Sequence, residues 1–129
     1  MDLRQAFWPL LGNWTGIERL GPDGGSARAM IVFKLDLQDQ AVLQDYRRVT
    51  ADGTELTGHG VFLVDPATAG LLWWYFDSGG VPPTPLPGRW SGDTLLLGPG
   101  GEHRLWLADD QLRRAGPGLE GSYQRISGH

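Results

Sequence analysis

Apolar and polar residues alternate along most of this chain with a period of two, the pattern of half-buried β-strands. In segment 27–37 the apolar face consists of Ala29, Ile31, Phe33, Leu35 and Leu37. Glycine, proline and aspartate cluster between such segments, as in tight turns. The pattern therefore predicts short strands over 13–20, 27–37, 41–49, 55–64, 71–77, 89–91, 94–97, 103–107, 111–115 and 119–126.

The N-terminal segment has helical spacing instead. Its apolar residues follow the i, i+3, i+4, i+7, i+8 order of one helical face and are Leu3, Ala6, Phe7, Leu10 and Leu11. Asp2 is suited to cap the helix and Gly12 to end it. Because Pro9 disfavours helical backbone at Trp8, the helix is expected to kink or end there.

About ten short strands joined in order by short turns predict an all-β fold, a single up-and-down antiparallel β-barrel. The barrel would form one domain over residues 1–129, with the short helix capping one end. Segment 81–88 holds four prolines and is predicted to be a loop or an edge crossing, since proline donates no ladder hydrogen bond.

The charge composition of the chain limits the kinds of partner that are expected. Fifteen acidic and eleven basic residues give a net charge of −4, with no basic run, which disfavours nucleic acid and anionic membranes as partners. No apolar run is long enough to span a bilayer, and the first residues lack the basic and apolar stretches of a signal peptide, so none is expected. The chain holds no cysteine, and its three histidines lack the spacing of a zinc site. A soluble, cytoplasmic protein without a metal is expected.

Short motifs along the whole chain resemble the calycin superfamily, the group of lipocalins and fatty-acid-binding proteins. They are closest to nitrobindin-type barrels and a related bacterial family of uncharacterised lipocalin-like domains. The motifs are 10–16 (LLGNWTG), 46–48 (YRR), 58–60 (GHG), 74–77 (WYFD), 89–95 (RWSGDTL) and 121–125 (GSYQR). The resemblance implies a closed barrel with an internal pocket.

The resemblance to nitrobindin-type proteins would imply a haem carrier. In such carriers a histidine at the start of the last strand binds the haem iron. The matching position here is Gly118, which has no side chain to coordinate a metal. Glu18 also replaces the third glycine of the Gly-x-Trp-x-Gly-x-Gly motif of that group. We therefore expect no haem, and no other cofactor.

Two tyrosine–arginine pairs are candidate ligand anchors. Tyr46 and Arg48 lie two residues apart, as do Tyr123 and Arg125, so each pair shares one strand face. A guanidinium beside a phenol in an apolar cavity suits a carboxylate or another small anion. Fatty-acid-binding barrels are similar in placing an arginine and a tyrosine on the last strand.

Each arginine has a structural alternative, which is to close a barrel end by donating to carbonyl groups or stacking on a tryptophan. For Arg125, with Trp14 as the stacking partner, both roles remain open. Arg48 favours the pocket, because Arg47 already supplies the charge on the outer face of that strand.

His59 lies between Gly58 and Gly60 in a predicted strand, where glycine marks a bulge or a close approach by another group. One interpretation places His59 at a ligand, and the other makes it a hydrogen-bonded structural residue. An enzyme of isomerase or hydrolase type would combine His59 with Tyr46 and Asp77 as acid and base.

Four consecutive aromatic residues, 73–76, must divide between the two faces of their strand. Leu72, Trp74 and Phe76 form the more apolar set and are expected to line the cavity. The other set would be covered by the helix, the 82–87 loop or a second subunit, which would make the protein a homodimer.

The leading hypothesis is a binding protein that encloses a largely apolar small molecule with a polar or anionic end. Its predicted ligand-binding residues are Trp14, Phe33, Tyr46, Arg48, His59, Trp74, Trp90, Tyr123 and Arg125. The alternatives are the enzyme above and a filled barrel that serves in interaction or dimerisation.

Overall fold

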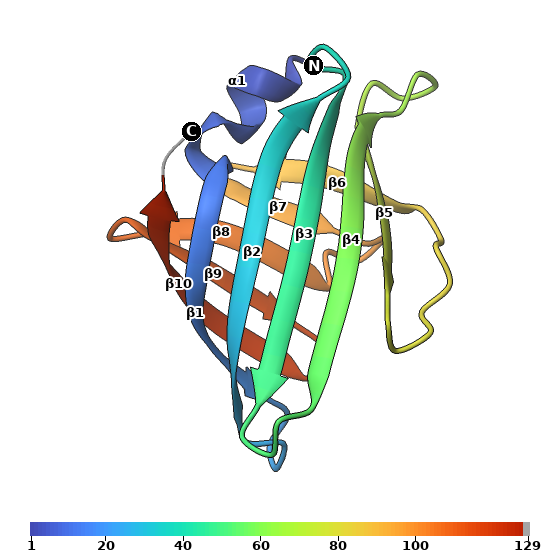
Figure 1. Ribbon diagram of the computed structural model, residues 1–129. Coiled ribbons are helices and arrows are strands. Elements are labelled where there is room, and N and C mark those ends of the chain that lie inside the picture. Colours follow the sequence, from blue (N-terminus) through green and yellow to red (C-terminus); the bar gives the residue numbers. More distant parts are fainter. Residues whose placement is uncertain (128–129) are drawn as a thin grey trace.

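The computed structural model describes residues 1–127 as a closed barrel of ten antiparallel strands with a short N-terminal helix (Figure 1). The strands are β1 (Gly12–Leu20), β2 (Ser26–Asp36), β3 (Ala41–Thr50), β4 (Glu55–Val64), β5 (Leu71–Asp77), β6 (Leu86–Ser91), β7 (Thr94–Leu97), β8 (His103–Ala108), β9 (Gln111–Gly116) and β10 (Leu119–Ser127). Each strand pairs with the next along the chain, and β10 pairs with β1 to close the barrel. The predicted all-β up-and-down barrel is confirmed, and it is consistent with a calycin-like barrel.

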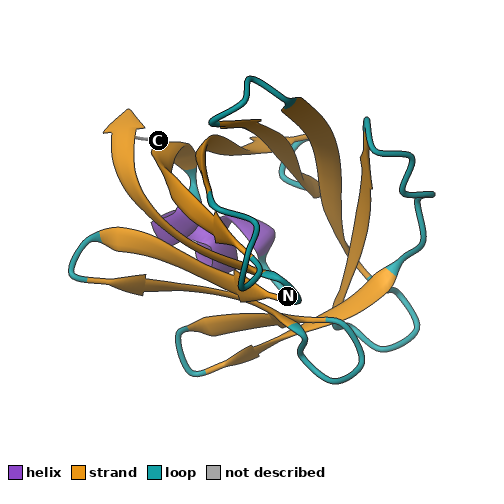
Figure 2. Cartoon of the chain, turned by 90° about the horizontal axis from the view of Figure 1, so that it is seen from below, coloured by secondary structure: helices purple, strands orange, loops and turns teal. Residues whose placement is uncertain are grey.

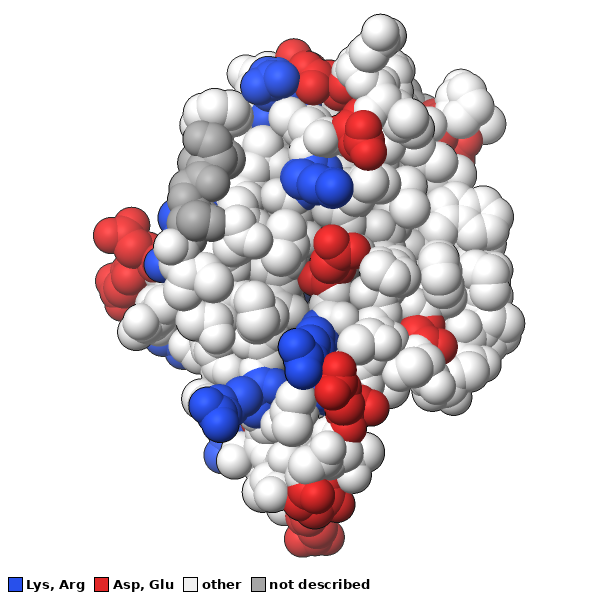
Figure 3. All heavy atoms as spheres, viewed as in Figure 1, with Lys and Arg blue, Asp and Glu red and all other residues white. Residues whose placement is uncertain are grey.

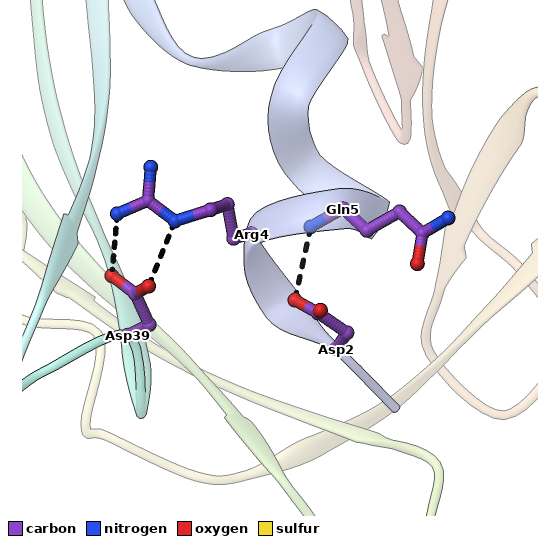
Figure 4. Close-up of polar contacts among 4 residues, drawn as sticks. All are labelled: Asp2, Arg4, Gln5 and Asp39. Atoms are coloured by element: carbon purple, nitrogen blue, oxygen red, sulfur yellow. Dashed lines mark hydrogen bonds and ion pairs between the residues drawn. The ribbon is translucent and has the colours of Figure 1, made fainter.

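The N-terminal segment forms α1 (Leu3–Phe7) and a 3-10 turn, η1 (Trp8–Leu10), which we call the cap. The predicted break at Pro9 is confirmed, because the α-helix gives way to the 3-10 turn at Trp8. The Asp2 side chain accepts a hydrogen bond from the Gln5 amide at 3.1 Å, as a helix N-cap does (Figure 4). No helix within residues 1–127 has the length and apolar character needed to cross a bilayer.

The cap covers one end of the barrel, as Figure 2 shows from the opposite end. Leu3, Phe7 and Leu10 are buried under it. Arg4 donates two hydrogen bonds, of 2.8 and 3.0 Å, to the carboxylate of Asp39 in the β2–β3 turn (Figure 4). This ion pair fixes the cap against the β2–β3 side of the barrel.

The interior differs between the two ends of the barrel. At the cap end aromatic rings pack together, with Phe62 lying 4.9 Å from Phe7 and 6.2 Å from Phe33 between ring centroids. The β1–β2 and β3–β4 turns lie at the far end of the barrel. In that half, polar side chains such as Glu18 and Tyr46 point into the interior. The barrel therefore has an apolar half under the cap and a polar half opposite to it.

Several predicted strand boundaries shift by one residue, and two differences affect the description of the barrel. The proline-rich loop ends earlier than expected, because β6 begins at Leu86 and pairs with β5 over three residues only. Pro87 fits there because its carbonyl accepts a hydrogen bond from the Gly98 amide at 2.8 Å, a bond that needs no proline donor. Leu37 has left β2 for a left-handed turn, with a φ of 52°, and its side chain is exposed.

The predicted faces of the aromatic strand are reversed. Trp73 is buried inside the barrel and Tyr75 shares its face, whereas Trp74 and Phe76 point outward. Gly58 and Gly60 of β4 provide the room for the inward rings. A Cβ on Gly58 would overlap the Tyr75 hydroxyl, and one on Gly60 would lie 2.9 Å from Nε1 of Trp73. The space that the glycines leave is therefore filled by the protein's own side chains.

Candidate functional site

A buried carboxylate forms the centre of the polar half. Glu18 has no exposed surface, and it accepts a hydrogen bond from the Tyr46 hydroxyl on one oxygen. Its other oxygen accepts one from the Tyr123 hydroxyl at 2.5 Å and lies 3.4 Å from Nη1 of Arg114. These four residues, which we call the Glu18 cluster, come from β1, β3, β9 and β10.

Strand alternation and small residues bring the cluster together. Glu18 follows Trp14 and Gly16 on the inner face of β1, so its side chain must point into the barrel. The Tyr123 ring leans along β10 over Gly121, where a Cβ would lie 2.6 Å from its Cζ atom. The glycine thus lets the phenol reach Glu18 on the neighbouring strand.

The tyrosines of the cluster are donors at neutral pH. Burial raises the pKa of Tyr46 to about 12, the nearby Glu18 charge adds to the rise, and Arg114 and Arg48 oppose it. Burial also raises the pKa of Tyr123, an effect that Arg114 partly offsets. Burial acts to lower the pKa of Arg114, but Tyr123 and Glu18 outweigh it and the pKa is raised. The cluster therefore holds a Glu18–Arg114 ion pair with two neutral phenols.

All three tyrosines of the chain are expected to titrate late. The third, Tyr75, also has its pKa raised, first by burial and then by Asp77. A raised pKa in the folded state means that the tyrosines favour folding below the unfolded pKa of about 10 and that this contribution is lost as the pH rises through the folded values. Near-ultraviolet phenolate absorbance should appear well above pH ~10 in the folded protein but near it in guanidinium chloride. Coincident curves would contradict the buried network.

Four further polar side chains share the inner face of the far half: Arg48, Tyr75, Asp77 and His103. They are only partly buried, and Arg114 retains 15% of its side-chain exposure, so solvent reaches this end of the interior. Burial, followed by the charge of Arg114, lowers the pKa of His103. No carboxylate among residues 1–127 forms an ion pair with Arg48.

Arg125 and Trp14 lie at the cap end, away from the Glu18 cluster. The Arg125 guanidinium lies 4.3 Å from the Trp14 ring centroid and donates to the carbonyl oxygens of Leu11 and, at 2.7 Å, Pro9. The Trp14 indole donates to the Leu10 carbonyl at 2.9 Å. Of the two roles left open for Arg125, the structure displays the closing of the barrel end.

His59 points out of the barrel, and its predicted place in the interior is wrong. Its Nδ1 lies 2.8 Å from Asp45 Oδ1, and 63% of its side chain is exposed. The alternation of β4 explains this, because the flanking glycines take the inner face. His59 and Tyr46 therefore lie on opposite faces of the barrel wall, and the His59–Tyr46–Asp77 arrangement is not assembled.

The remaining predicted ligand-binding residues lie at the cap end, on the outer face or in the polar half. Phe33 and Trp90 point inward at the cap end, where Trp90 contacts Phe7 edge-on at 5.6 Å. Trp74 is on the outer face, as the corrected strand assignment requires. Of the predicted set, the structure brings together Tyr46, Arg48 and Tyr123 in the polar half.

Sequence reasoning missed Glu18 and Arg114 as site residues. A signal was present for both. Glu18 follows the inward Trp14 at a spacing of four, and Arg114 follows the buried Leu112 at a spacing of two. A charged residue in phase with a buried strand face indicates a polar group inside the barrel.

The chain matches no protein-family model, and no curated protein matches it. Within the part of the chain that the structure describes, no three histidine, aspartate or glutamate side chains gather closely enough to hold a metal ion. Gly118 lies in the turn between β9 and β10, with a φ of 70°, and offers no atom to coordinate haem iron. His129 lies outside the described residues.

Proposed function

We propose that this protein binds a small amphipathic molecule with an anionic end inside the polar half of its barrel. The observation that carries the proposal is Arg48, an inward, partly buried guanidinium without a carboxylate partner among the described residues. Arg48 interacts with the Tyr46 side chain, but a partly buried guanidinium is stabilised further by an anionic partner. A carboxylate on a ligand would meet the planar fork of the guanidinium.

The charges near Arg48 support an anion rather than a cation. Glu18 is already matched by Arg114, and both its oxygens accept tyrosine hydroxyls. Asp77 accepts the Gly79 amide at 2.9 Å in the turn that follows β5. Among these charged groups, Arg48 is the cation that has no ion-pair partner within residues 1–127, which supports a ligand anion as its partner.

The apolar half limits the size of the ligand. Packed rings at the cap end, including Phe7, Phe33 and Phe62, occupy the space that a long acyl chain would need. We therefore infer a compact molecule whose short apolar body would lie against inward residues of the far half such as Ala29 and Leu56. The proposed ligand is therefore smaller than a fatty acid.

Other parts of the sequence-based hypothesis remain proposals. They are membership of the calycin superfamily near the nitrobindin-type barrels, a cytoplasmic location and the absence of a cofactor. A homodimer would now use the outward Trp74 and Phe76, of which Phe76 is 42% exposed. The outer face around β1–β4 carries cationic and anionic side chains interspersed, which supports a partner other than nucleic acid (Figure 3).

Thermal unfolding with matched acid and amide pairs tests the proposal. Small aromatic and short-chain carboxylic acids are expected to raise Tm in a concentration-dependent way, while the corresponding neutral amides are not. An acid at 100 times its Kd should add about 2.7 kcal/mol of stability. Equal effects of acids and amides would contradict the anionic end, and no effect across the panel would favour a filled barrel that acts in interaction.

A further inference from the structure

A hollow of about 480 Å³ lies at the cap end, separate from the polar half. Its lining comes from the cap, the β6–β7 hairpin and β8, and includes Gln5, Pro9, Leu10, Trp90, Asp93 and Leu107. This size is typical of small-molecule pockets, which are mostly apolar with a few polar groups.

The position of the cap explains why the hollow exists. The eight residues of α1 and η1 are held to the β2–β3 side by the Arg4–Asp39 ion pair. In the order of strands around the barrel, β6, β7 and β8 lie across from β2 and β3. So short a cap leaves the barrel end beside β6–β8 unfilled, between Leu10 and Trp90.

Two polar groups of the hollow, one donor and one acceptor, are suited to bind a ligand. The indole N–H of Trp90 is buried and meets no acceptor in the described part of the chain. An unpaired buried donor is unfavourable, so an acceptor brought to it is stabilised. Asp93 is the one charged residue in the lining, is exposed, and takes part in no ion pair with residues 1–127.

We propose that this hollow binds a small, flat, amino-substituted nitrogen heterocycle. A ring nitrogen of such a molecule accepts the Trp90 N–H, its amino group donates to the Asp93 carboxylate, and its ring packs against Leu10 and Leu107. The negative charge of Asp93 disfavours anions, so this site and the polar half select opposite kinds of ligand.

The N–H of Trp90 is reached through a small movement of the lining. The carbonyl groups of Pro9 and Leu10 are held by Arg125 and Trp14, so the exposed Gln5 side chain on the cap is the part of the lining with the greatest freedom to shift. Trp90 itself is held in β6, where it pairs with Leu95 of β7. The ligand is thus expected to displace the Gln5 side chain and leave the hairpin in place.

Indole N–H resonances of the full-length protein test the proposal. The six tryptophans give separate signals in a proton–nitrogen correlation spectrum, and Trp90→Phe identifies the one that matters while keeping an aromatic ring. Titration with adenine and with 2-aminopyridine is expected to move the Trp90 signal and leave that of Trp106, which points outward from β8, unchanged. An unmoved Trp90 signal at saturating probe would overturn the proposal.

Charge variants give a second readout that does not depend on Trp90. Asp93→Asn, an exposed change, is expected to weaken 2-aminopyridine binding about tenfold, a loss of about 1.4 kcal/mol. Asp23→Asn, in the β1–β2 turn at the far end, serves as the matched control and should bind as the wild type does. Equal affinity of the two variants for 2-aminopyridine would refute the site. So would benzoate if it moved the Trp90 signal as much as 2-aminopyridine does. Arg48→Gln should leave 2-aminopyridine binding in the hollow unchanged. A failure of the hollow proposal can therefore be distinguished from a failure of the proposed anion site in the polar half.

Discussion

The substitution Glu18→Ala is expected to lower the free energy of unfolding by about 3–5 kcal/mol. Glu18 has no exposed surface, and its removal leaves the Arg114 charge without its ion-pair partner. It also removes the acceptor of two tyrosine hydroxyls, those of Tyr46 and Tyr123. Losses of partners for buried polar groups add to the cost of an uncompensated charge.

Denaturant unfolding measures this effect, with Glu120→Ala as the matched control. Glu120 pairs with Arg19 at 3.1 Å, but the two side chains are 70% and 75% exposed, so its loss should cost no more than about 1 kcal/mol. Glu18→Gln, which keeps an acceptor oxygen, should fall between the two. Similar losses from Glu18→Ala and Glu120→Ala would show that the buried cluster does not stabilise the fold.

Gly16→Ala is expected to destabilise the protein by about 3 kcal/mol, the upper end of the usual range for overpacking. Gly16 lies where β1 and β10 close the barrel. A Cβ there would overlap the carbonyl oxygen of Ser122 and lie 2.6 Å from Cα of Tyr123. Because these are backbone atoms, relief requires the two strands to separate, which would also draw Tyr123 away from Glu18.

Gly70→Ala is the control for a glycine at which an added Cβ would overlap no backbone atom. A Cβ on Gly70 would lie 3.3 Å from the Thr68 hydroxyl oxygen, a contact that a small shift of this side chain relieves. A change in the free energy of unfolding below about 1 kcal/mol is expected for this variant. Circular dichroism melts compare the two, and a Gly16→Ala protein as stable as Gly70→Ala would contradict the close approach of β1 and β10.

Strand order could be predicted because each long strand has one buried face. Ala29, Ile31 and Phe33 are buried as their alternation predicts, and the turn residues between segments set the number of strands. With short turns between consecutive strands, an antiparallel meander is the simplest arrangement, and closure removes its edges. These are local signals, so the sequence is sufficient for them.

The face of β5 could not be assigned in the same way, because four aromatic residues in succession give no contrast between polar and apolar positions. What decides the face is the neighbouring strand. Gly58 and Gly60 of β4 leave room for the rings of Tyr75 and Trp73, and that contact depends on the register between β4 and β5. The same glycines turn His59 outward.

Only part of the candidate site could be predicted, because some of its contacts depend on neighbouring strands and on the cap. Tyr46, Arg48 and Tyr123 follow from alternation within single strands. Their partner Glu18 was noted only as a departure from a family motif, because a single charge in a strand is usually exposed. The role of Arg125 depends on carbonyl groups of the cap, Pro9 and Leu11, whose positions are set by tertiary structure.

Isothermal titration of Arg48→Gln and Arg47→Gln with the acid that most stabilises the wild type tests the central claim most directly. The two arginines are adjacent on β3, but Arg47 is 57% exposed and pairs with Glu55, whereas Arg48 faces the interior. If the barrel binds an anion at Arg48, Arg48→Gln should raise Kd at least about tenfold, near 1.4 kcal/mol, and Arg47→Gln should leave it unchanged. Equal affinities for the two variants would contradict the account.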